Sequence, residues 1–257
     1  DEAIECKDAI IKNFVEDFGM KKAIIVGASS GIGEEMAKQL SEKGYQLGLM
    51  ARRIELLNTL NDELGSKHVV MQIDLQNFDD AENKMKTMIS ELKDVDIIIL
   101  NSGIGTQEYQ LDWKYQKQVI DVNVSGLVLM STVAMDYFIK RERGQIVGIS
   151  SIAAHISSGL ALTYCASKAF VSSYLNGLRS RARRSKLPIT ITTIEPGYVD
   201  TPMVKSAMPW MAPVGKAVSQ MVKGIENLEQ HMYITKRVRW VVWFIKITPN
   251  WLIRRFI

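Results

Sequence analysis

Tyr164 and Lys168 are two residues whose types and spacing suit acid–base chemistry. Residues four apart share one face of a helix, so the phenol and the ammonium are expected to point the same way. A free tyrosine has a pKa of about 10 and is a poor base at neutral pH. A neighbouring lysine charge favours the phenolate, so we expect a lowered tyrosine pKa and proton exchange with a substrate oxygen. Taken alone, the same spacing also occurs where a surface tyrosine and lysine meet by chance.

Polar and turn-forming residues follow several predicted strands and support this interpretation. Ser150 and Ser151 end a strand shortly before Tyr164, and Asn123 lies within a long predicted helix. The remaining members of the set follow other strands: Asp74, Leu75, Asn101, Gly103, Pro196, Gly197, Val199 and Thr201. Open α/β sheets bind ligands at the carboxyl ends of their strands, so we expect these residues to meet in one crevice.

A glycine-rich turn joins the first predicted strand to a helix. Its sequence is Gly27-Ala28-Ser29-Ser30-Gly31-Ile32-Gly33. Backbone N–H groups in such a turn approach a pyrophosphate, which then sits at the positive end of the helix. The spacing G-x-x-x-G-x-G differs from the common G-x-G-x-x-G fingerprint, and an ordinary tight turn would also explain a glycine cluster. Its position at the first strand–helix junction favours dinucleotide binding.

The end of the second predicted strand distinguishes between two dinucleotides. An acid there would bind the ribose 2′-hydroxyl of NAD, whereas an arginine accommodates the 2′-phosphate of NADP. This chain has Met50-Ala51-Arg52-Arg53 at that position. Guanidinium groups match phosphate oxygens well, so the sequence favours NADP(H) over NAD(H). The alternative is that Arg52 and Arg53 are only solvated at a helix start.

Short β-branched apolar runs alternate with longer amphipathic stretches along the chain, which predicts a parallel sheet covered by helices on both faces. We therefore expect a three-layer αβα, doubly wound fold with a mostly parallel sheet of about seven strands. The predicted strands are Lys22–Val26, Gln46–Met50, Val69–Ile73, Asp96–Leu100, Gln145–Ile149, Ile189–Ile194 and Met232–Thr235. The predicted helices are Gly33–Lys43, Arg53–Leu64, Asp79–Leu92, Trp113–Ile139 and Leu162–Arg184.

Composition restricts the class of protein. A chain of 257 residues suits one α/β domain, and 47% apolar with 23% charged residues argues against long disorder. Two cysteines, Cys6 and Cys165, predict no disulfide framework and fit a reducing compartment. The three histidines are far apart in sequence, so no metal site is expected. The longest apolar runs are strand-sized, so no membrane span is expected.

Charge is distributed unevenly. The net charge is +4, yet the last 22 residues carry six lysines and arginines and no acid, which leaves the rest of the chain at 4 − 6 = −2. A nucleic-acid-binding protein is therefore not expected. The apolar, basic segment 236–257 suits an interfacial helix on anionic lipid, most clearly in 239–257. It equally suits a contact with its own or another subunit, or a cover for an apolar substrate channel.

Taken together, the motifs resemble those of the short-chain dehydrogenase/reductase family in its common form. The resemblance runs roughly from Lys21 to Thr201. It implies a Rossmann-type catalytic domain that interconverts a carbonyl and an alcohol by hydride transfer with NAD(P)(H). By this resemblance Tyr164 would exchange the proton, Ser151 would hydrogen-bond the reacting oxygen, and Lys168 would bind the nicotinamide ribose and lower the tyrosine pKa. Asn123 would hold a water in a relay toward Lys168.

The cofactor contacts are also implied by the resemblance. Asp74 would contact the adenine, and Thr201 would contact the pyrophosphate and carboxamide region. The full expected set is Gly27, Ser29, Ser30, Gly31, Ile32, Gly33, Arg52, Arg53, Asp74, Leu75, Asn101, Gly103, Tyr164, Lys168, Pro196, Gly197, Val199 and Thr201. Two departures from the family pattern are small: Val26 replaces a frequent threonine, and Ser102-Gly103-Ile104 replaces Asn-Ala-Gly.

Three functional hypotheses follow. The first is an NADP(H)-dependent carbonyl reductase or alcohol dehydrogenase acting on a hydrophobic ketone. The second is a dinucleotide-binding regulatory protein without turnover, which predicts the loss of a catalytic group, although Ser151, Tyr164 and Lys168 are all present. The third is a peripheral membrane enzyme acting on lipid intermediates. By family resemblance we expect a homodimer or homotetramer, paired through the two long helices. The two cysteines fit a cytoplasmic protein, with peripheral membrane contact as the alternative.

Several further segments are interpreted one by one. Residues 1–19 are interpreted as an N-terminal extension, either a helix or a segment that precedes an alternative start at Met20, with 20–257 as a single catalytic domain. His155 is interpreted as a loop or core histidine, and Cys165 as a packing residue pointing away from the reactive face. Met203, Met208, Trp210 and Met211 predict a flexible apolar lid over the substrate.

Overall fold

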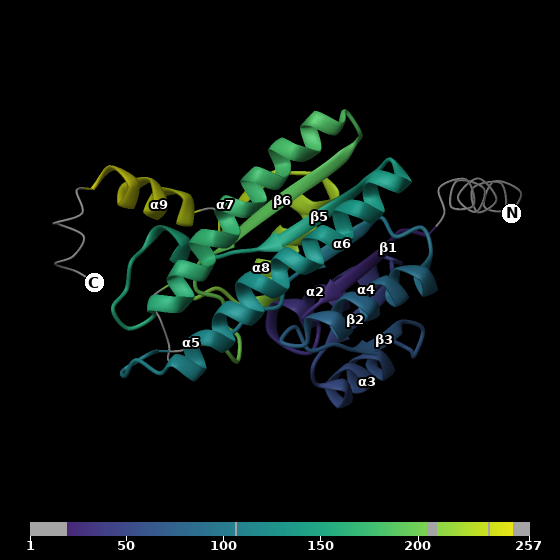
Figure 1. Cartoon of the computed structure of the whole chain (residues 1–257), viewed down its shortest axis with the longest axis horizontal. Coiled ribbons are helices and arrows are strands. Elements are labelled where there is room, and N and C mark those ends of the chain that lie inside the picture. The colour runs from purple at the N-terminus through teal and green to yellow at the C-terminus, as the bar shows by residue number, and fades with distance from the viewer. Residues whose placement is uncertain (1–19, 106, 205–209, 236, 249–257) are drawn as a thin grey trace, which may run out of the picture.

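A seven-stranded sheet forms the centre of the computed structural model, which describes residues 20–105, 107–204, 210–235 and 237–248. The strands are β1 (Lys22–Val26), β2 (Gln46–Ala51), β3 (Val69–Gln72), β4 (Ile97–Leu100), β5 (Gly144–Ile149), β6 (Ile189–Pro196) and β7 (His231–Ile234). Every pairing is parallel, in the order β3-β2-β1-β4-β5-β6-β7. Figure 1 shows α6 and α7 crossing the near face of this sheet, with α8 behind it.

The described helices connect successive strands. They are α2 (Gly31–Glu42), α3 (Ile54–Glu63), α4 (Phe78–Leu92), α5 (Trp113–Ile120), α6 (Gly126–Arg141), α7 (Leu162–Ser185), α8 (Val214–Glu226) and α9 (Val238–Ile247). A π-helical turn, Asp121–Ser125, lies between α5 and α6, and a 3₁₀ turn, Ile152–His155, follows β5. The predicted helix Trp113–Ile139 is thus interrupted by the π turn.

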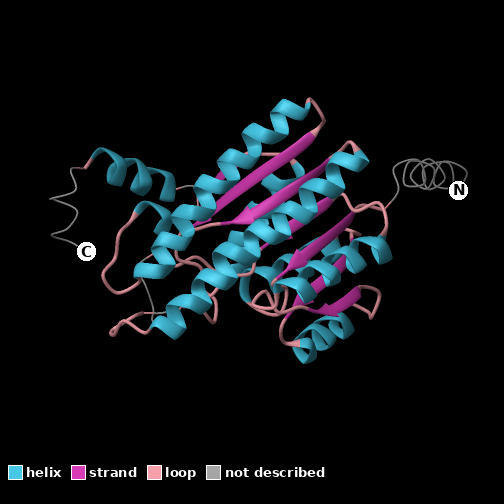
Figure 2. Ribbon diagram, in the orientation of Figure 1, coloured by secondary structure: helices cyan, strands magenta, loops and turns pink. Residues whose placement is uncertain are grey.

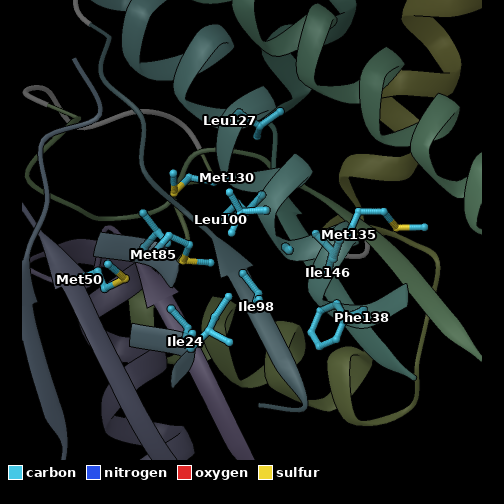
Figure 3. Packing of buried hydrophobic residues seen from close by; sticks show 14 of the residues in the cluster. Ile24, Met50, Met85, Ile98, Leu100, Leu127, Met130, Met135, Phe138 and Ile146 are labelled. Carbon is cyan, nitrogen blue, oxygen red and sulfur yellow. The ribbon is translucent and has the colours of Figure 1, made fainter. Parts of the chain in front are cut away.

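The sheet separates two hydrophobic cores, because side chains alternate between its faces. Along β1, Ala23 and Ile25 belong to one core, whereas Ile24 and Val26 belong to the other. Figure 3 shows the core that contains Ile24 and Val26. In it, Ile24 and Ile98 from the sheet lie among helix side chains such as Met85 and Phe138. The sheet is therefore buried on both sides, which explains why its strands read as continuous apolar runs.

The strand order reverses between β1 and β4. From β1 the chain builds outward through β2 to β3, then crosses back to β4 and builds outward to β7. At such a reversal the two flanking crossovers run to opposite faces, leaving a crevice at the carboxyl ends of the strands. The predicted fold class is confirmed, and all seven strands lie where the sequence placed them to within two residues.

Two features differ from the sequence expectation. Helix α8 was not anticipated, although Ala217, Val218, Met221, Val222 and Ile225 bury one face of it. The continuous helical stretch Trp113–Arg141 is, by length and composition, apolar enough to cross a membrane, contrary to the expectation from apolar runs. Half of its most apolar window is buried inside the fold, and a buried core helix meets the same criteria.

Candidate active site

A cavity of about 650 Å³ opens at the carboxyl ends of the strands. Seventeen of the 18 predicted cofactor positions and three of the four predicted catalytic residues line it, and Tyr164 and Lys168 belong to both sets. The predicted residues that line it are Gly27, Ser29, Ser30, Gly31, Ile32, Arg52, Arg53, Asp74, Leu75, Asn101, Gly103, Ser151, Tyr164, Lys168, Pro196, Gly197, Val199 and Thr201. Only Gly33 and Asn123 of the predicted set lie outside its wall, and both pack directly behind it.

The glycine turn has the close backbone approaches that the sequence predicts. Gly27 has a φ of +94°, and a Cβ there would lie 2.7 Å from the Ser102 nitrogen. A Cβ at Gly33 would lie 2.1 Å from the Gly27 carbonyl oxygen, so helix α2 packs against the turn only because residue 33 is a glycine. Asn101 Nδ2 donates to the same carbonyl oxygen at 2.8 Å and ties β4 to the turn.

The amino end of α2 faces this cavity. Ser30 is its N-cap residue, and the Ser30 side chain does not cap the helix. The first N–H groups of a helix have no partner within the helix and carry its positive dipole end. The turn therefore presents backbone donors to the cavity, and the close approaches at Gly27 and Gly33 leave no room for a side chain at either position. These features fit the pyrophosphate of a dinucleotide.

Two guanidinium groups lie next to the glycine turn. Arg52 and Arg53 follow β2 directly, and both side chains are exposed and line the cavity. Arg53 Nη2 donates to Ser30 Oγ at 2.7 Å and to Ser29 Oγ at 3.1 Å. The guanidinium group of Arg53 is thus bound to the two serines of the turn, while Arg52 is the first residue after β2.

Tyr164 and Lys168 lie in the first two turns of α7, on the cavity side. The Lys168 Nζ lies 5.7 Å from the centroid of the Tyr164 ring and donates to the Ile149 carbonyl oxygen at 3.0 Å. Ser151 lies two residues after the end of β5 and forms a side-chain hydrogen bond with Tyr164. The Ser151 Oγ also accepts from the Ala153 N–H at 3.1 Å, which fixes it at the start of the 3₁₀ turn.

Burial determines how these groups titrate. It raises the pKa of Tyr164, and the hydrogen bond with Ser151 opposes part of that rise. This reverses the expected lowering of the tyrosine pKa. The physical reason is that the phenol is enclosed by the cavity wall, while the lysine ammonium is directed at the Ile149 oxygen. Burial also lowers the pKa of Lys168 to about 8.

Asn123 supports the site from behind through the π turn. Its Oδ1 accepts from the Ile104 N–H at 2.8 Å, and its Nδ2 donates to the Ile104 carbonyl oxygen at 2.9 Å. The same Nδ2 donates to Ser167 Oγ at 3.0 Å. A single amide therefore ties the loop after β4 to helix α7. The sequence singled out this residue, but its π-helical setting has no signal in the residue pattern.

Glu108 was missed by sequence reasoning. It is buried, and its Oε1 accepts from the Thr163 N–H at 3.1 Å. The backbone N–H of Glu108 donates to the Leu160 carbonyl oxygen at 2.7 Å. Ala161, the N-cap residue of α7, has no capping side chain, so this distant carboxylate caps the helix that carries Tyr164. Its separation of 55 residues from Thr163 hides the relationship in the sequence.

Glu195, directly before Pro196, was also missed. It is buried at the end of β6, and its Oε2 lies 2.6 Å from His155 Nε2. Ser172 Oγ donates to its Oε1 at 2.7 Å. Burial acts to raise the pKa of Glu195, but hydrogen bonds with His155, His231 and Ser172 outweigh it and lower the pKa to about 2. The one sequence signal for this group is a single acid at the end of a strand made otherwise of isoleucine, threonine and proline.

The structure also locates most of the other residues that the sequence singled out. His155 pairs with Glu195 behind the site, which fits its interpretation as a structural histidine. Cys165 is buried but lines the cavity, so the expectation that it points away is wrong. Met203 lines the mouth and Trp210 is largely exposed, whereas Met208 lies outside the described residues. Among the described residues no group of three or more metal-binding side chains gathers.

Gly105, in the loop after β4, lies directly against the Tyr164 ring. A Cβ at Gly105 would lie 2.3 Å from the ring atom Cδ2. Only a glycine permits the loop after β4 to lie against the phenol in this position. The ring is thus confined between this loop and Ser151.

Comparison with known proteins decides the family. The model of the short chain dehydrogenase family matches residues 21–212. This chain belongs to the short-chain dehydrogenase family. It is an oxidoreductase of the short-chain dehydrogenase/reductase type.

Individual members are similar to different degrees. The human dehydrogenase/reductase SDR family member 7 is 33% identical over 194 residues, covering 72% of this chain and 57% of that protein. A short chain dehydrogenase/reductase from Burkholderia phymatum in complex with NAD has a TM-score of 0.79 at 19% identity, covering 88% of this chain and 92% of that one. An alcohol dehydrogenase from the archaeon Thermococcus sibiricus, complexed with 5-hydroxy-NADP, has a TM-score of 0.74 at 21% identity, covering 84% and 96%. The two structures share the fold with this oxidoreductase and differ in the dinucleotide they hold.

Proposed function

We propose that this oxidoreductase reduces a hydrophobic ketone with NADPH, using Tyr164 as the proton donor. The observation that carries the proposal is the meeting of Tyr164, Ser151 and Lys168 in the same cavity as the glycine turn. The dinucleotide supplies the hydride when bound. What the protein supplies is a proton, a hydrogen bond to the reacting oxygen and a shaped, largely apolar pocket.

The protonation of the site is compatible with the reductive direction. The Tyr164 phenol, whose pKa burial raises, is protonated at neutral pH and so has a proton to donate. The Ser151 hydroxyl is placed beside the phenol, where it would stabilise charge developing on the carbonyl oxygen. With a pKa of about 8, Lys168 is mostly charged at neutral pH and would stabilise the phenolate left after donation.

The apolar residues of the cavity wall support an apolar substrate. Ile104, Ile152, Ile156, Leu160 and Val204 are among the residues that line the cavity. Burying apolar surface against such side chains is favourable, at about 25 cal/mol for each Å² removed from water. A bulky hydrophobic ketone would gain more from this wall than a small polar one.

Replacing Tyr164 by phenylalanine tests the proton donor. Tyr164→Phe removes one hydroxyl, and we expect ketone-dependent NADPH oxidation to fall about 10²–10⁴-fold, the usual contribution of a general acid. Turnover is measured across a panel of ketones and aldehydes, and NADPH binding is followed separately by fluorescence. Tyr174→Phe is the matched control, because Tyr174 lies on the same helix and does not line the cavity. Full turnover in Tyr164→Phe would refute the mechanism.

The preference for NADPH is proposed from the two arginines. Replacing Arg52 by aspartate puts an acid at the strand tip, which we expect to weaken NADPH binding about tenfold to hundredfold and to improve NADH binding. The ratio of the two dissociation constants, measured by titration calorimetry, checks this. Arg143→Asp makes the same charge change at an exposed arginine directly before β5, at the amino ends of the strands, and serves as control. An unchanged ratio in Arg52→Asp would show that the arginines are only solvated.

A further inference from the structure

Helix α9 carries an apolar stripe on its solvent side. Trp240, Trp243, Phe244 and Ile247 are 63%, 56%, 61% and 56% exposed. Their spacing of three, four and seven residues puts them on one face of the helix. Val242, 1% exposed, lies on the other side of α9, and the helix packs against β7 and the 3₁₀ turn. The helix is therefore held to the protein by one face and presents a second apolar face outward.

Basic side chains flank this stripe. Arg239 lies with its guanidinium carbon 5.3 Å from the centroid of the Trp240 ring, and the Trp240 and Trp243 rings meet edge to face at 6.4 Å. Arg237 donates to the Trp210 carbonyl oxygen at 3.2 Å. The sequence has no acid after Glu229. Exposed tryptophans beside arginines are the combination that partitions into the interface of an anionic bilayer.

The stripe lies beside the mouth of the cavity. A Cβ at Gly197, which lines the cavity, would lie 2.8 Å from Val238 at the start of α9. Leu160, Tyr198 and Met203 line the cavity and are also close to half exposed, so they form part of its rim. Figure 2 shows α9 at the same end of the molecule as the first turns of α7. A surface that bound the stripe would also face this rim.

We propose that α9 docks the protein on anionic membranes, with the Trp240–Trp243–Phe244–Ile247 stripe in the lipid interface and the cavity mouth turned toward the bilayer. This surface is independent of the proposed reaction. The occupant is a lipid surface rather than a second copy of the chain. A two-fold contact through the stripe would place Arg237 and Arg239 next to their own copies, with no acid in the segment to compensate.

Vesicle co-sedimentation of the full chain tests the proposal. We expect the wild-type protein to pellet with vesicles of phosphatidylcholine and phosphatidylglycerol at 7:3, and about tenfold less with phosphatidylcholine alone. Raising the salt to about 0.5 M should weaken binding, because it screens the arginine charges. The triple variant Trp240→Ser, Trp243→Ser, Phe244→Ser should lose at least tenfold in vesicle affinity. Trp113→Ser, an equally exposed tryptophan on α5, should bind like the wild type.

Two further measurements make the outcome decisive. Circular dichroism of the triple variant confirms that it folds, which is expected because the three side chains are exposed. Sedimentation velocity without vesicles reports the size of the wild type and the variant. A wild-type protein that stays in the supernatant with anionic vesicles would overturn the proposal, as would a triple variant that pellets equally well. Loss of an oligomer in the variant without any vesicle binding would assign the stripe to a subunit contact instead.

Discussion

At the scale of single residues, the buried Lys168 ammonium lowers the stability of the folded protein, although the proposed reaction uses its charge. Burial lowers the pKa of Lys168 to about 8, which means that the folded protein holds this proton less tightly than the unfolded chain does. The charged form is therefore a cost to folding at all pH values below about 8. That cost is relieved as the pH rises from about 8 toward the usual value of 10.5, where the unfolded chain also loses the proton.

Lys168→Met should therefore stabilise the protein and inactivate it. At pH 7 we expect the free energy of unfolding to rise by roughly 1–3 kcal/mol, since each pKa unit corresponds to about 1.4 kcal/mol. The difference from wild type should shrink between pH 8 and 10, and ketone reduction should be lost. Urea denaturation across this pH range measures the effect. Lys223→Met, on the exposed side of α8, should stay within about 0.5 kcal/mol of wild type. A destabilised Lys168→Met would contradict the expectation.

At the scale of elements, the loop after β4 and helix α7 form one unit. Glu108 caps α7 from this loop, Asn123 binds the loop backbone at Ile104, and Gly105 lies against the Tyr164 ring. Each contact joins residues that are distant in sequence. The position of the phenol thus depends on a loop that takes no direct part in the proposed proton transfer.

Removing the Glu108 carboxylate should loosen this unit. Glu108→Ala takes away the acceptor for the Thr163 N–H and the negative charge at the helix start, so we expect a loss of about 0.5–2 kcal/mol in the free energy of unfolding. Turnover should fall with it, because the first turn of α7 carries Tyr164. Glu108→Gln, which keeps one acceptor oxygen, should recover part of both. Glu91→Ala, at an exposed acid of α4, is the control. Equal stability of Glu108→Ala and wild type would show that the cap is dispensable.

Features that depend on local sequence patterns were predictable, whereas contacts between distant residues were not. The strands were predictable because a sheet buried on both faces needs continuous apolar runs, as in Ile97–Leu100. The residues of the glycine turn were predictable because their spacing is local. Glu108 and Glu195 were not, because their partners lie 55 and 40 residues away and only folding brings them together. The raised pKa of Tyr164 was missed for the same reason, since the spacing to Lys168 says nothing about enclosure by the cavity wall.

At the scale of the whole molecule, the outer surfaces of α5, α6 and α7 retain apolar side chains. Ile120, Ile139 and Phe170 are each more than a third exposed. A shallow apolar groove, lined by Phe78, Val124, Ser125, Val128, Leu129 and Thr132, runs along α6. Such a surface on long neighbouring helices suits a two-fold contact between subunits. We propose that the expected homodimer or homotetramer is joined through this surface, away from α9.

A charge in this surface should separate the subunits. Phe170→Glu puts a carboxylate beside Tyr174, against which Phe170 stacks at 5.7 Å, and we expect a shift from dimer or tetramer toward monomer. Sedimentation velocity at several protein concentrations measures it. Leu56→Glu, at an equally exposed apolar residue on α3, should leave the assembly unchanged. The prediction fails if wild type and Phe170→Glu sediment alike.

The all-parallel sheet also has a consequence for how the chain reaches its native state. No two neighbouring strands are joined by a hairpin, and β1 meets β4 only after more than 70 residues, as in the pairing of Ala23 with Ile97. Closing such large loops costs entropy before the pairing returns any stability, so folding through high contact order is slow. We therefore expect that, during synthesis, the backbone N–H and C=O groups on one edge of β1 stay unpaired until β4 has been made, and that the cavity, whose lining residues extend from Gly27 to Val204, is completed late. The same topology that brings the reactive groups together is then expected to expose the unfinished chain to aggregation.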